Sequence, residues 1–389
     1  MTKELSVRLN GIQVGILKLV KGKMEFTYDK NTKSQISLSL PIQNESYKEK
    51  ICRAYFGGLL PENRNIREKL AQKYNLNINN DFKLLEEIGR DCAGAISFHK
   101  LSESEKKEEY IEIKGKLLSE EEIKTFIEEL PYKPYMGNRI SLAGAQEKTA
   151  ICLINNKIAL PIEDFPTTHI LKTAIPRYEQ SIENEYICMK TAQEIGLDVA
   201  SVEIRKINDL KFLLVKRFDR EIKDNKIKRI LQEDFAQSLG IQSRNKYDIT
   251  FKDCLNVLNQ LKPPAIQKIK FIKQVVFNYL IGNTDAHGKN FSIFLDSRTL
   301  TPAYDLLCSS VYDCDQRIAM KIGKARYYKD VTEKDWIKFS QDLDVSPKFV
   351  KTELERQKQI LPEIMKKIVQ EINSEIGHKI LEIVQHNCK

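Results

Sequence analysis

Residues 282–291 read GNTDAHGKNF, and this stretch carries the strongest chemical signal in the chain. Asp285 and Asn290 are five residues apart, with small residues between them. A carboxylate placed in this way accepts a proton from a hydroxyl group, and an amide oxygen suits a hard cation such as magnesium. The spacing alone also fits a polar turn after a helix expected over residues 271–281. Other motifs in the sequence must therefore show whether Asp285 and Asn290 belong to a catalytic site or only to a polar turn.

A second acidic residue follows in residues 301–305, TPAYD. Asp305 comes fifteen residues after Asn290, beyond a short strand expected over residues 291–294. Protein kinases place a base Asp, a magnesium-binding Asn five residues later and a second magnesium-binding Asp in this order. The pattern predicts Asp285 as the general base, with Asn290 and Asp305 as magnesium ligands.

Upstream residues supply the other parts of a nucleotide site. Residues 141–148, SLAGAQEK, contain small residues whose backbone amides could approach a phosphate, although the stretch matches neither the Walker pattern nor G-x-G-x-x-G. Lys172 ends a strand expected over residues 168–172, where its ammonium could reach two phosphates of ATP. Glu183 or Glu185, on the next helix, could pair with it.

The order of these parts carries more weight than any one of them. A phosphate loop, a lysine, a helix glutamate, a hinge candidate over residues 214–219, a base Asp, a metal Asn and a metal Asp follow one another as in a kinase. The sequence therefore predicts a transferase that uses ATP and magnesium.

The chain of 389 residues is long enough for two or three domains. Alternating apolar residues flank the turn at residues 10–11, which indicates a hairpin, and residues 36–40 suggest another strand. Ser119 and Glu122 form a capping-box pattern at the start of a helix.

We expect an α+β, two-lobed, kinase-like fold, with a strand-rich N-terminal half and an all-helical C-terminal half. Its expected domains are residues 1–100, an N-terminal subdomain; 101–230, the nucleotide-binding N-lobe; and 231–389, the helical C-lobe.

Composition, charge and cysteine spacing limit the class of protein and its cellular location. The net charge of +9 is spread along the chain, and 41% hydrophobic residues are ordinary for a globular protein. The eight cysteines form no C-x-x-C pair, which argues against a zinc ribbon. No apolar run resembles a signal peptide or a membrane span, so we expect a cytoplasmic protein with no membrane contact.

These motifs resemble the HipA family of serine/threonine kinase toxins. The likeness covers most of the chain and fades after residue 325. In the N-terminal part it rests on residues 56–64 (FGGLLPENR) and 89–97. In the rest of the chain the matching stretches are residues 141–149 (SLAGAQEKT), 168–172 (THILK), 184–186 (NEY), 216–220 (KRFDR), 232–237 (QEDFAQ), 282–292 (GNTDAHGKNFS) and 300–305 (LTPAYD).

The resemblance implies roles for individual residues. Asp285 would be the general base, supported by His287, and Asn290 and Asp305 would bind Mg²⁺. The implied ATP contacts are Ala143, Gly144, Ala145, Gln146, Glu147, Lys148, Lys172, Lys216, Arg217, Phe218, Lys289 and Tyr304. Lys216 stands where the family often has an acidic residue, so an adenine contact through that side chain departs from the family pattern.

The resemblance also implies regulation and partners. Ser141 matches the serine that family members autophosphorylate, and a phosphate there would add roughly −1.5 to −2 charges beside the phosphates of ATP. The implied substrate is an aminoacyl-tRNA synthetase, such as glutamyl-tRNA synthetase. The implied partner is a HipB-like helix-turn-helix antitoxin, through which the complex would bind operator DNA.

Two other functions fit the same motifs. A catalytically silent pseudokinase could serve as a subunit of a DNA-bound repressor complex, but such proteins usually lose one of the residues that are intact here. A small-molecule kinase could share the fold, although a self-phosphorylation site suits transfer to protein.

Overall fold

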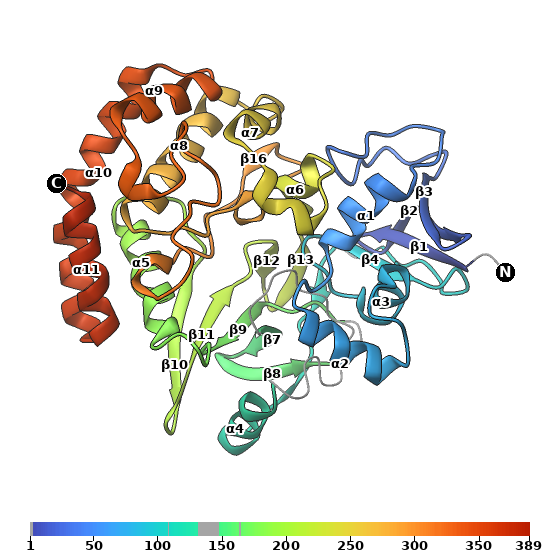
Figure 1. Cartoon of the computed structure of the whole chain (residues 1–389). Helices are drawn as coiled ribbons and strands as arrows, with labels where there is room; N and C mark the ends of the chain where they lie inside the picture. Colours follow the sequence, from blue (N-terminus) through green and yellow to red (C-terminus); the bar gives the residue numbers. More distant parts are fainter. Residues whose placement is uncertain (1–2, 108, 131–147, 163–164) are drawn as a thin grey trace.

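A computed structural model describes residues 3–107, 109–130, 148–162 and 165–389. Its N-terminal unit is a four-stranded antiparallel sheet, in the order β3-β2-β1-β4, covered by short helices (Figure 1). The strands are β1 (Lys3–Leu9), β2 (Ile12–Val20), β3 (Lys23–Tyr28) and β4 (Ile96–His99), and the helices are α1 (Glu49–Gly58), α2 (Arg64–Tyr74) and α3 (Asp81–Ile88).

The hairpin expected at residues 10–11 is confirmed, because β1 and β2 pair as neighbours with Leu9 opposite Ile12. Asn10 and Gly11 both have positive φ, as tight hairpin turns require. The strand expected at residues 36–40 is wrong, since Ser37 and Leu40 form only an isolated bridge. Ile36 and Leu40 are nevertheless buried, so their apolar character serves the core without a sheet.

The middle of the chain forms a six-stranded sheet in the order β10-β11-β9-β7-β8-β6. Helix α4 packs its apolar face against this sheet through Phe126 and Ile127, and the capping box of Ser119 and Glu122 at its start is confirmed. The strands and helices of this region are β6 (Gly115–Leu117), β7 (Lys148–Ile154), β8 (Lys157–Pro161), β9 (His169–Thr173), β10 (Val202–Ile207), β11 (Leu210–Lys216), α4 (Glu120–Glu129) and α5 (Ser181–Glu194). A small sheet beside it contains β5 (Ile111–Glu112), β12 (Arg220–Lys223) and β13 (Lys226–Arg229).

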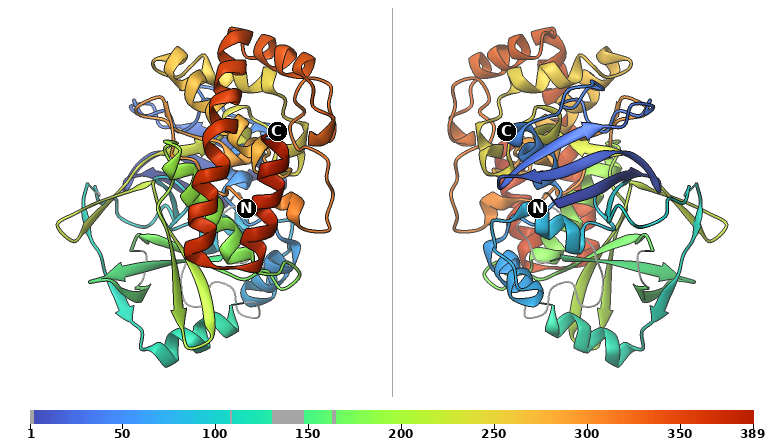
Figure 2. Two further views of the ribbon diagram at one scale, coloured as in Figure 1. Left: turned by 90° about the vertical axis from the view of Figure 1, so that its left-hand side faces the viewer. Right: turned by 90° about the vertical axis from the view of Figure 1, so that its right-hand side faces the viewer.

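Helices dominate the C-terminal part. Helices α10 and α11 lie side by side along the outer face, and α10 also packs against α5 and α8 (Figure 2). The helices are α6 (Phe235–Ser238), α7 (Phe251–Leu258), α8 (Pro264–Leu280), α9 (Glu333–Asp342), α10 (Pro347–Ile372) and α11 (Glu375–Asn387). Short 3-10 turns are η1 (Ser243–Asp248), η2 (Gly288–Asn290), η3 (Ser309–Val311) and η4 (Tyr328–Asp330).

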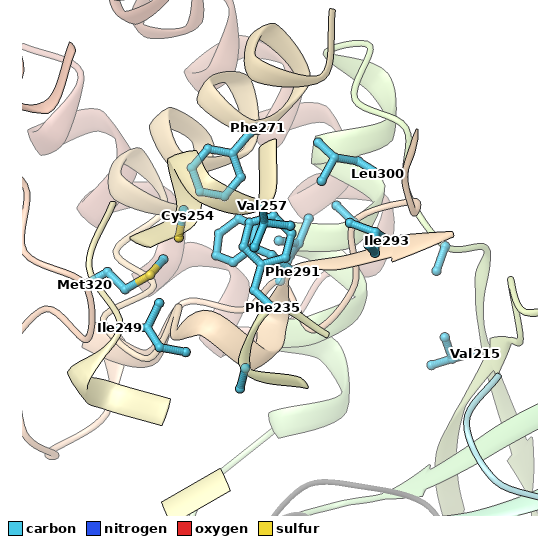
Figure 3. Packing of buried hydrophobic residues seen from close by; sticks show 14 of the residues in the cluster. Val215, Phe235, Ile249, Cys254, Val257, Phe271, Phe291, Ile293, Leu300 and Met320 are labelled. Carbon is cyan, nitrogen blue, oxygen red and sulfur yellow. The ribbon is translucent and has the colours of Figure 1, made fainter. Parts of the chain in front are cut away.

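The α+β class is confirmed, but the C-terminal part is not all-helical. Strands β14 (Gln232–Asp234), β15 (Ser292–Phe294) and β16 (Thr299–Leu300) form a three-stranded sheet within it. Aromatic rings of Phe235, Phe271 and Phe291 meet behind this sheet, with ring centroids of Phe271 and Phe291 4.7 Å apart (Figure 3). This packing fixes the loop between α8 and β15, where the candidate catalytic residues lie.

Among the described residues, every helix is too short or too polar to cross a membrane.

Candidate active site

The loop of residues 281–290 leaves the end of α8 through a sharp turn. Gly282 has φ of +71°, and a Cβ at this position would lie 2.1 Å from the hydroxyl oxygen of Ser310. Asn283 donates its side-chain amide to Asn278 Oδ1 over 2.8 Å, and the Thr284 amide donates to Ser309 Oγ over 2.7 Å. These bonds fix the backbone on both sides of the turn, so that Asp285 is presented at the surface.

Asp285 is engaged by a residue that no sequence motif indicates. The hydroxyl of Tyr247, in η1, donates to Asp285 Oδ1 over 2.9 Å. Desolvation raises the pKa of Asp285, and the bond from Tyr247 opposes this rise because it stabilises the carboxylate. A raised pKa makes the carboxylate a better proton acceptor than an ordinary surface Asp.

A cluster of four side chains joins the two lobes. Lys172, on β9, places Nζ 2.6 Å from Glu185 Oε1 on α5 and 2.6 Å from Asp305 Oδ1. Asn290 donates Nδ2 to Asp305 Oδ2 over 3.1 Å. Glu185 is therefore the partner of Lys172, whereas Glu183 pairs with Lys211 on β11.

The charges of neighbouring groups keep Asp305 and Lys172 of this cluster in their charged forms. Burial would raise the pKa of Asp305, but Lys172 and then Lys148 outweigh it and hold the pKa well below its usual range. Burial likewise would lower the pKa of Lys172, and Asp305 and Glu185 raise it instead. Asp305 is 35% exposed although its partners Lys172 and Glu185 are nearly inaccessible, so one side of the cluster is open.

The backbone of Asp305 adds to this picture. Its φ is +59°, in the left-handed region that residues other than glycine seldom adopt. Conformations of this kind cost free energy and occur often where function requires a fixed side-chain direction. Here the conformation accompanies simultaneous contacts from Asp305 to Lys172 and Asn290.

Lys148 lies directly across the sheet from Lys172, because β7 pairs with β9 in that register. Burial and then the nearby charge of Lys172 lower the pKa of Lys148. Two cross-strand lysines repel each other unless a negative group lies between or beside them. The pair therefore forms a cationic spot next to Asp305.

Two further predicted site residues lie in or beside the loop, His287 and Tyr304. The backbone amide of His287 donates to Asn290 Oδ1 over 3.1 Å, and burial lowers the pKa of His287 to about 3, so the ring is neutral. Its Nδ1 is buried with no hydrogen-bond partner among the described residues. Tyr304 donates its hydroxyl to Lys289 O over 2.7 Å and supports the loop from below.

Lys289 is directed toward the N-terminal unit. Its Nζ lies 2.5 Å from Asp234 Oδ2, 3.3 Å from Gly58 O and 3.8 Å from Glu62 Oε1. Only 5% of its side chain is exposed. Through these contacts Lys289 joins the loop of residues 281–290 to Gly58 and Glu62 of the N-terminal unit.

The predicted hinge divides into three environments. Lys216 is exposed, and Phe218 is half-buried against the ring of Tyr304 with centroids 5.4 Å apart. Arg217 is buried and pairs with Asp91 over 3.1 Å and with Asp219 over 2.8 Å. The guanidinium of Arg217 therefore belongs to the protein interior and is held by Asp91 and Asp219.

Part of the predicted site cannot be placed. Ser141, Ala143, Gly144, Ala145, Gln146 and Glu147 lie outside the described residues. Of the remaining predicted residues, Lys172, Asn290 and Asp305 meet directly, with Lys148 beside Lys172, whereas Arg217 and Lys289 are engaged in other contacts.

Comparison with known proteins agrees with this geometry. The model of the HipA-like C-terminal domain matches residues 140–376, and that of the HipA N-terminal domain matches residues 5–99. The chain belongs to the HipA family.

Relatives at the sequence level are named as kinases. Y4mE of Sinorhizobium fredii, named as a kinase, is 40% identical over 333 residues, which cover 82% of this chain and 78% of the relative. The serine/threonine-protein kinase toxin HipA of Shewanella oneidensis is 30% identical over 320 residues, covering 74% of this chain and 70% of that protein. The family membership thus places the chain among kinases.

Among solved structures, the fold is similar to that of HipA in a complex of Shewanella oneidensis HipA, HipB and operator DNA. The TM-score is 0.86 at 24% sequence identity, and the match covers 99% of this chain and 96% of that one. The similarity confirms the two-lobed, kinase-like architecture.

Proposed function

We propose that this HipA-family chain is a serine/threonine protein kinase toxin that transfers the γ-phosphate of ATP to a protein hydroxyl. The cluster of Lys172, Glu185, Asp305 and Asn290 carries this proposal, because it brings the lysine–glutamate pair and two oxygen ligands of a kinase together. Family membership supports it independently.

The residues present suit ATP and a magnesium ion. Asp305 is held as a carboxylate and Asn290 offers an amide oxygen, which are hard oxygen donors of the kind that Mg²⁺ prefers. Bound Mg²⁺ would neutralise phosphate charge in the transition state. Lys172 and Lys148 would face the phosphates, and the unpartnered Nδ1 of His287 gives a further buried polar atom to satisfy.

In the proposed reaction Asp285 accepts the proton of the acceptor hydroxyl. The hydroxyl oxygen then forms a bond to the γ-phosphorus while the bond between that phosphorus and the β,γ-bridging oxygen breaks, which leaves ADP. Lys172 holds the phosphates in place, and Glu185 keeps the lysine directed toward Asp305. Because the pKa of Asp285 is raised, proton acceptance is favoured at neutral pH.

Regulation and partners follow from the family likeness. We propose that Ser141 is an autophosphorylation site that switches the kinase off, that a HipB-like antitoxin binds the chain, and that operator DNA is reached through that antitoxin. The solved relative was seen with HipB and operator DNA, which supports the last two points. An aminoacyl-tRNA synthetase is the proposed protein substrate.

The test is incubation of wild type and Asp285→Gln with γ-labelled ATP and Mg²⁺, followed by mapping of labelled peptides. We expect label on Ser141 in wild type only, because the substitution replaces the carboxylate with a neutral amide and so removes the base. Equal labelling of both proteins would refute the role of Asp285. ATP binding with no labelling of wild type, alone or with candidate synthetases, would refute the kinase proposal.

A further inference from the structure

We propose that Tyr247 is a positioning residue for Asp285 and that the N-terminal unit places it through Glu62 and Lys246. The inference rests on the proposed function, since it assumes that Asp285 is the base. It makes the N-terminal unit a working part of the acceptor side of the active site.

Tyr247 contacts the base and its neighbour at the same time. Its hydroxyl donates to Asp285 Oδ1, and its ring meets the ring of His287 edge-on, with centroids 5.3 Å apart. Tyr247 is nevertheless 51% exposed, and Nζ of Lys246 lies over its ring, 5.3 Å from the centroid. An aromatic ring exposed beside the proposed base therefore forms part of the surface that an acceptor protein meets.

The hydrogen bond restricts the carboxylate. A free Asp side chain rotates among several orientations, and a bond to one oxygen fixes which oxygen faces the acceptor. With Oδ1 occupied by Tyr247, Oδ2 is the oxygen left for the proton of the acceptor hydroxyl. The geometry thus assigns the two oxygens different tasks.

The N-terminal unit supports this arrangement through one carboxylate. Glu62 Oε2 lies 2.9 Å from Nζ of Lys246, the residue before Tyr247, and Glu62 Oε1 lies 3.8 Å from Nζ of Lys289 in the catalytic loop. The side chains of Glu62 and Lys246 are only 16% and 11% exposed. Salt and water weaken the attraction within such a partly buried pair less than they weaken that within an exposed pair.

Glu62 therefore ties η1 and the catalytic loop to one anchor. Burial would raise the pKa of Glu62, but Lys289 and Lys246 lower it, so the carboxylate is charged. The segment that carries Tyr247 and the loop that carries Asp285 are thereby held in register from outside the two kinase lobes.

The experiment measures self-labelling with γ-labelled ATP and Mg²⁺ at several pH values, for wild type, Tyr247→Phe and Glu62→Gln. Tyr247→Phe keeps the ring and removes only the hydroxyl. We expect its plateau rate, the rate at pH values above the acid fall of the profile, to decrease about tenfold. A decrease of this size is in line with loss of a hydrogen bond to a charged group. The ATP concentration for half-maximal rate should not change, because the contacts described for Tyr247 are with Asp285, His287 and Lys246 and not with the Lys172 cluster.

The acid limb, the part of the rate profile in which the rate falls as the pH is lowered, distinguishes a positioning role of Tyr247 from a general loss of folded structure. Charged or titratable groups that act on Asp285 include Tyr247, Lys246, Asp305, Glu62 and Cys314. Loss of the Tyr247 bond should move the limb to higher pH, because that bond lowers the pKa of Asp285. Glu62→Gln should lower the plateau too but move the limb to lower pH, because it removes a negative charge.

Tyr110→Phe is the matched control. Tyr110 is also an exposed tyrosine that is hydrogen-bonded to a carboxylate, that of Glu221, far along the chain from the catalytic loop. Its removal should change neither the rate nor the limb. Melting temperatures of all variants show whether any loss of rate reflects unfolding.

The outcomes separate two failures. Wild type that labels normally, with Tyr247→Phe unchanged in plateau and limb, would overturn the role of Tyr247 and leave the proposed function intact. An inactive wild type that binds ATP would overturn the proposed function itself. Should Tyr247→Phe melt early, an unchanged plateau and limb in Glu62→Gln would still overturn the coupling to the N-terminal unit.

Discussion

Two clusters of opposite charges lie close to the join between the lobes, and they are built from similar residues. One contains Asp91, Asp219, Arg217, Arg220 and Arg229, whose side chains are at most 5% exposed. The other contains Lys172, Glu185, Asp305 and Asn290, and its Asp305 is 35% exposed. We call them the closed cluster and the open cluster.

The difference contrasts an ion network closed on all sides with one that stays open to a ligand. In the closed cluster Asp91 receives bonds from three arginines and from Thr167, which leaves no face for a ligand. It links Asp91 of the N-terminal unit to Arg217, Arg220 and Arg229, from the end of β11 to the end of β13. In the open cluster a lysine, a carboxylate and an amide hold one another but meet solvent on one side, where a phosphate and a cation could enter.

The largest effect should come from Asp305→Asn in the open cluster. It keeps the size of the side chain but removes the negative charge, so we expect phosphoryl transfer to fall on the order of a thousandfold, like the loss of other strong transition-state contacts. Initial rates with γ-labelled ATP measure this. Asp313→Asn, at an exposed position further along the chain, is the control. An Asp305 variant at more than a tenth of the wild-type rate would contradict the assignment.

Asp91→Ala should have the next largest effect, on stability. It leaves buried arginines without their shared carboxylate, and breaking such a network costs about 3–5 kcal/mol. Urea denaturation measures the free energy of unfolding. Activity per folded molecule at low temperature should stay close to that of wild type, so a stable but inactive Asp91→Ala would show that the closed cluster takes part in chemistry.

Mild acid should separate the two regions. The pKa of Asp285 is raised, so on acidification Asp285 is protonated at a higher pH than an ordinary Asp. The rate should fall at that higher pH, because the protonated form cannot act as a base. The pKa of Asp91 is lowered in the folded state, so its contribution to stability is complete above its unfolded pKa and is lost only as the pH falls below it. Parallel pH profiles of rate and melting temperature test this, and the two falling together would contradict it.

The smallest effect should come from a third kind of ion pair. Asp315 and Arg317 are both largely exposed, and water screens their attraction. Asp315→Ala should leave the unfolding midpoint unchanged in a denaturant series. A clear destabilisation would mean that exposure alone does not explain the contrast between the clusters.

The local sequence determined much of what is found here. The hairpin at Asn10 and Gly11, the capping box at Ser119 and the order of Lys172, Asp285, Asn290 and Asp305 all follow from neighbouring residues or from motif spacing. Backbone preferences and capping bonds act over a few residues, so a single sequence displays them. The strand predicted for residues 36–40 was wrong because alternating apolar residues indicate which side chains are buried. They do not establish that the segment pairs with another strand.

Contacts between distant residues were decided by the tertiary structure alone. Glu185 rather than Glu183 meets Lys172 because the rotation of α5 on the sheet selects one of two nearby carboxylates. Tyr247 lies 38 residues from Asp285, and Arg217 lies 126 residues from Asp91. No local preference encodes such pairs, because they exist only once packing has brought separate elements together and removed the water between them.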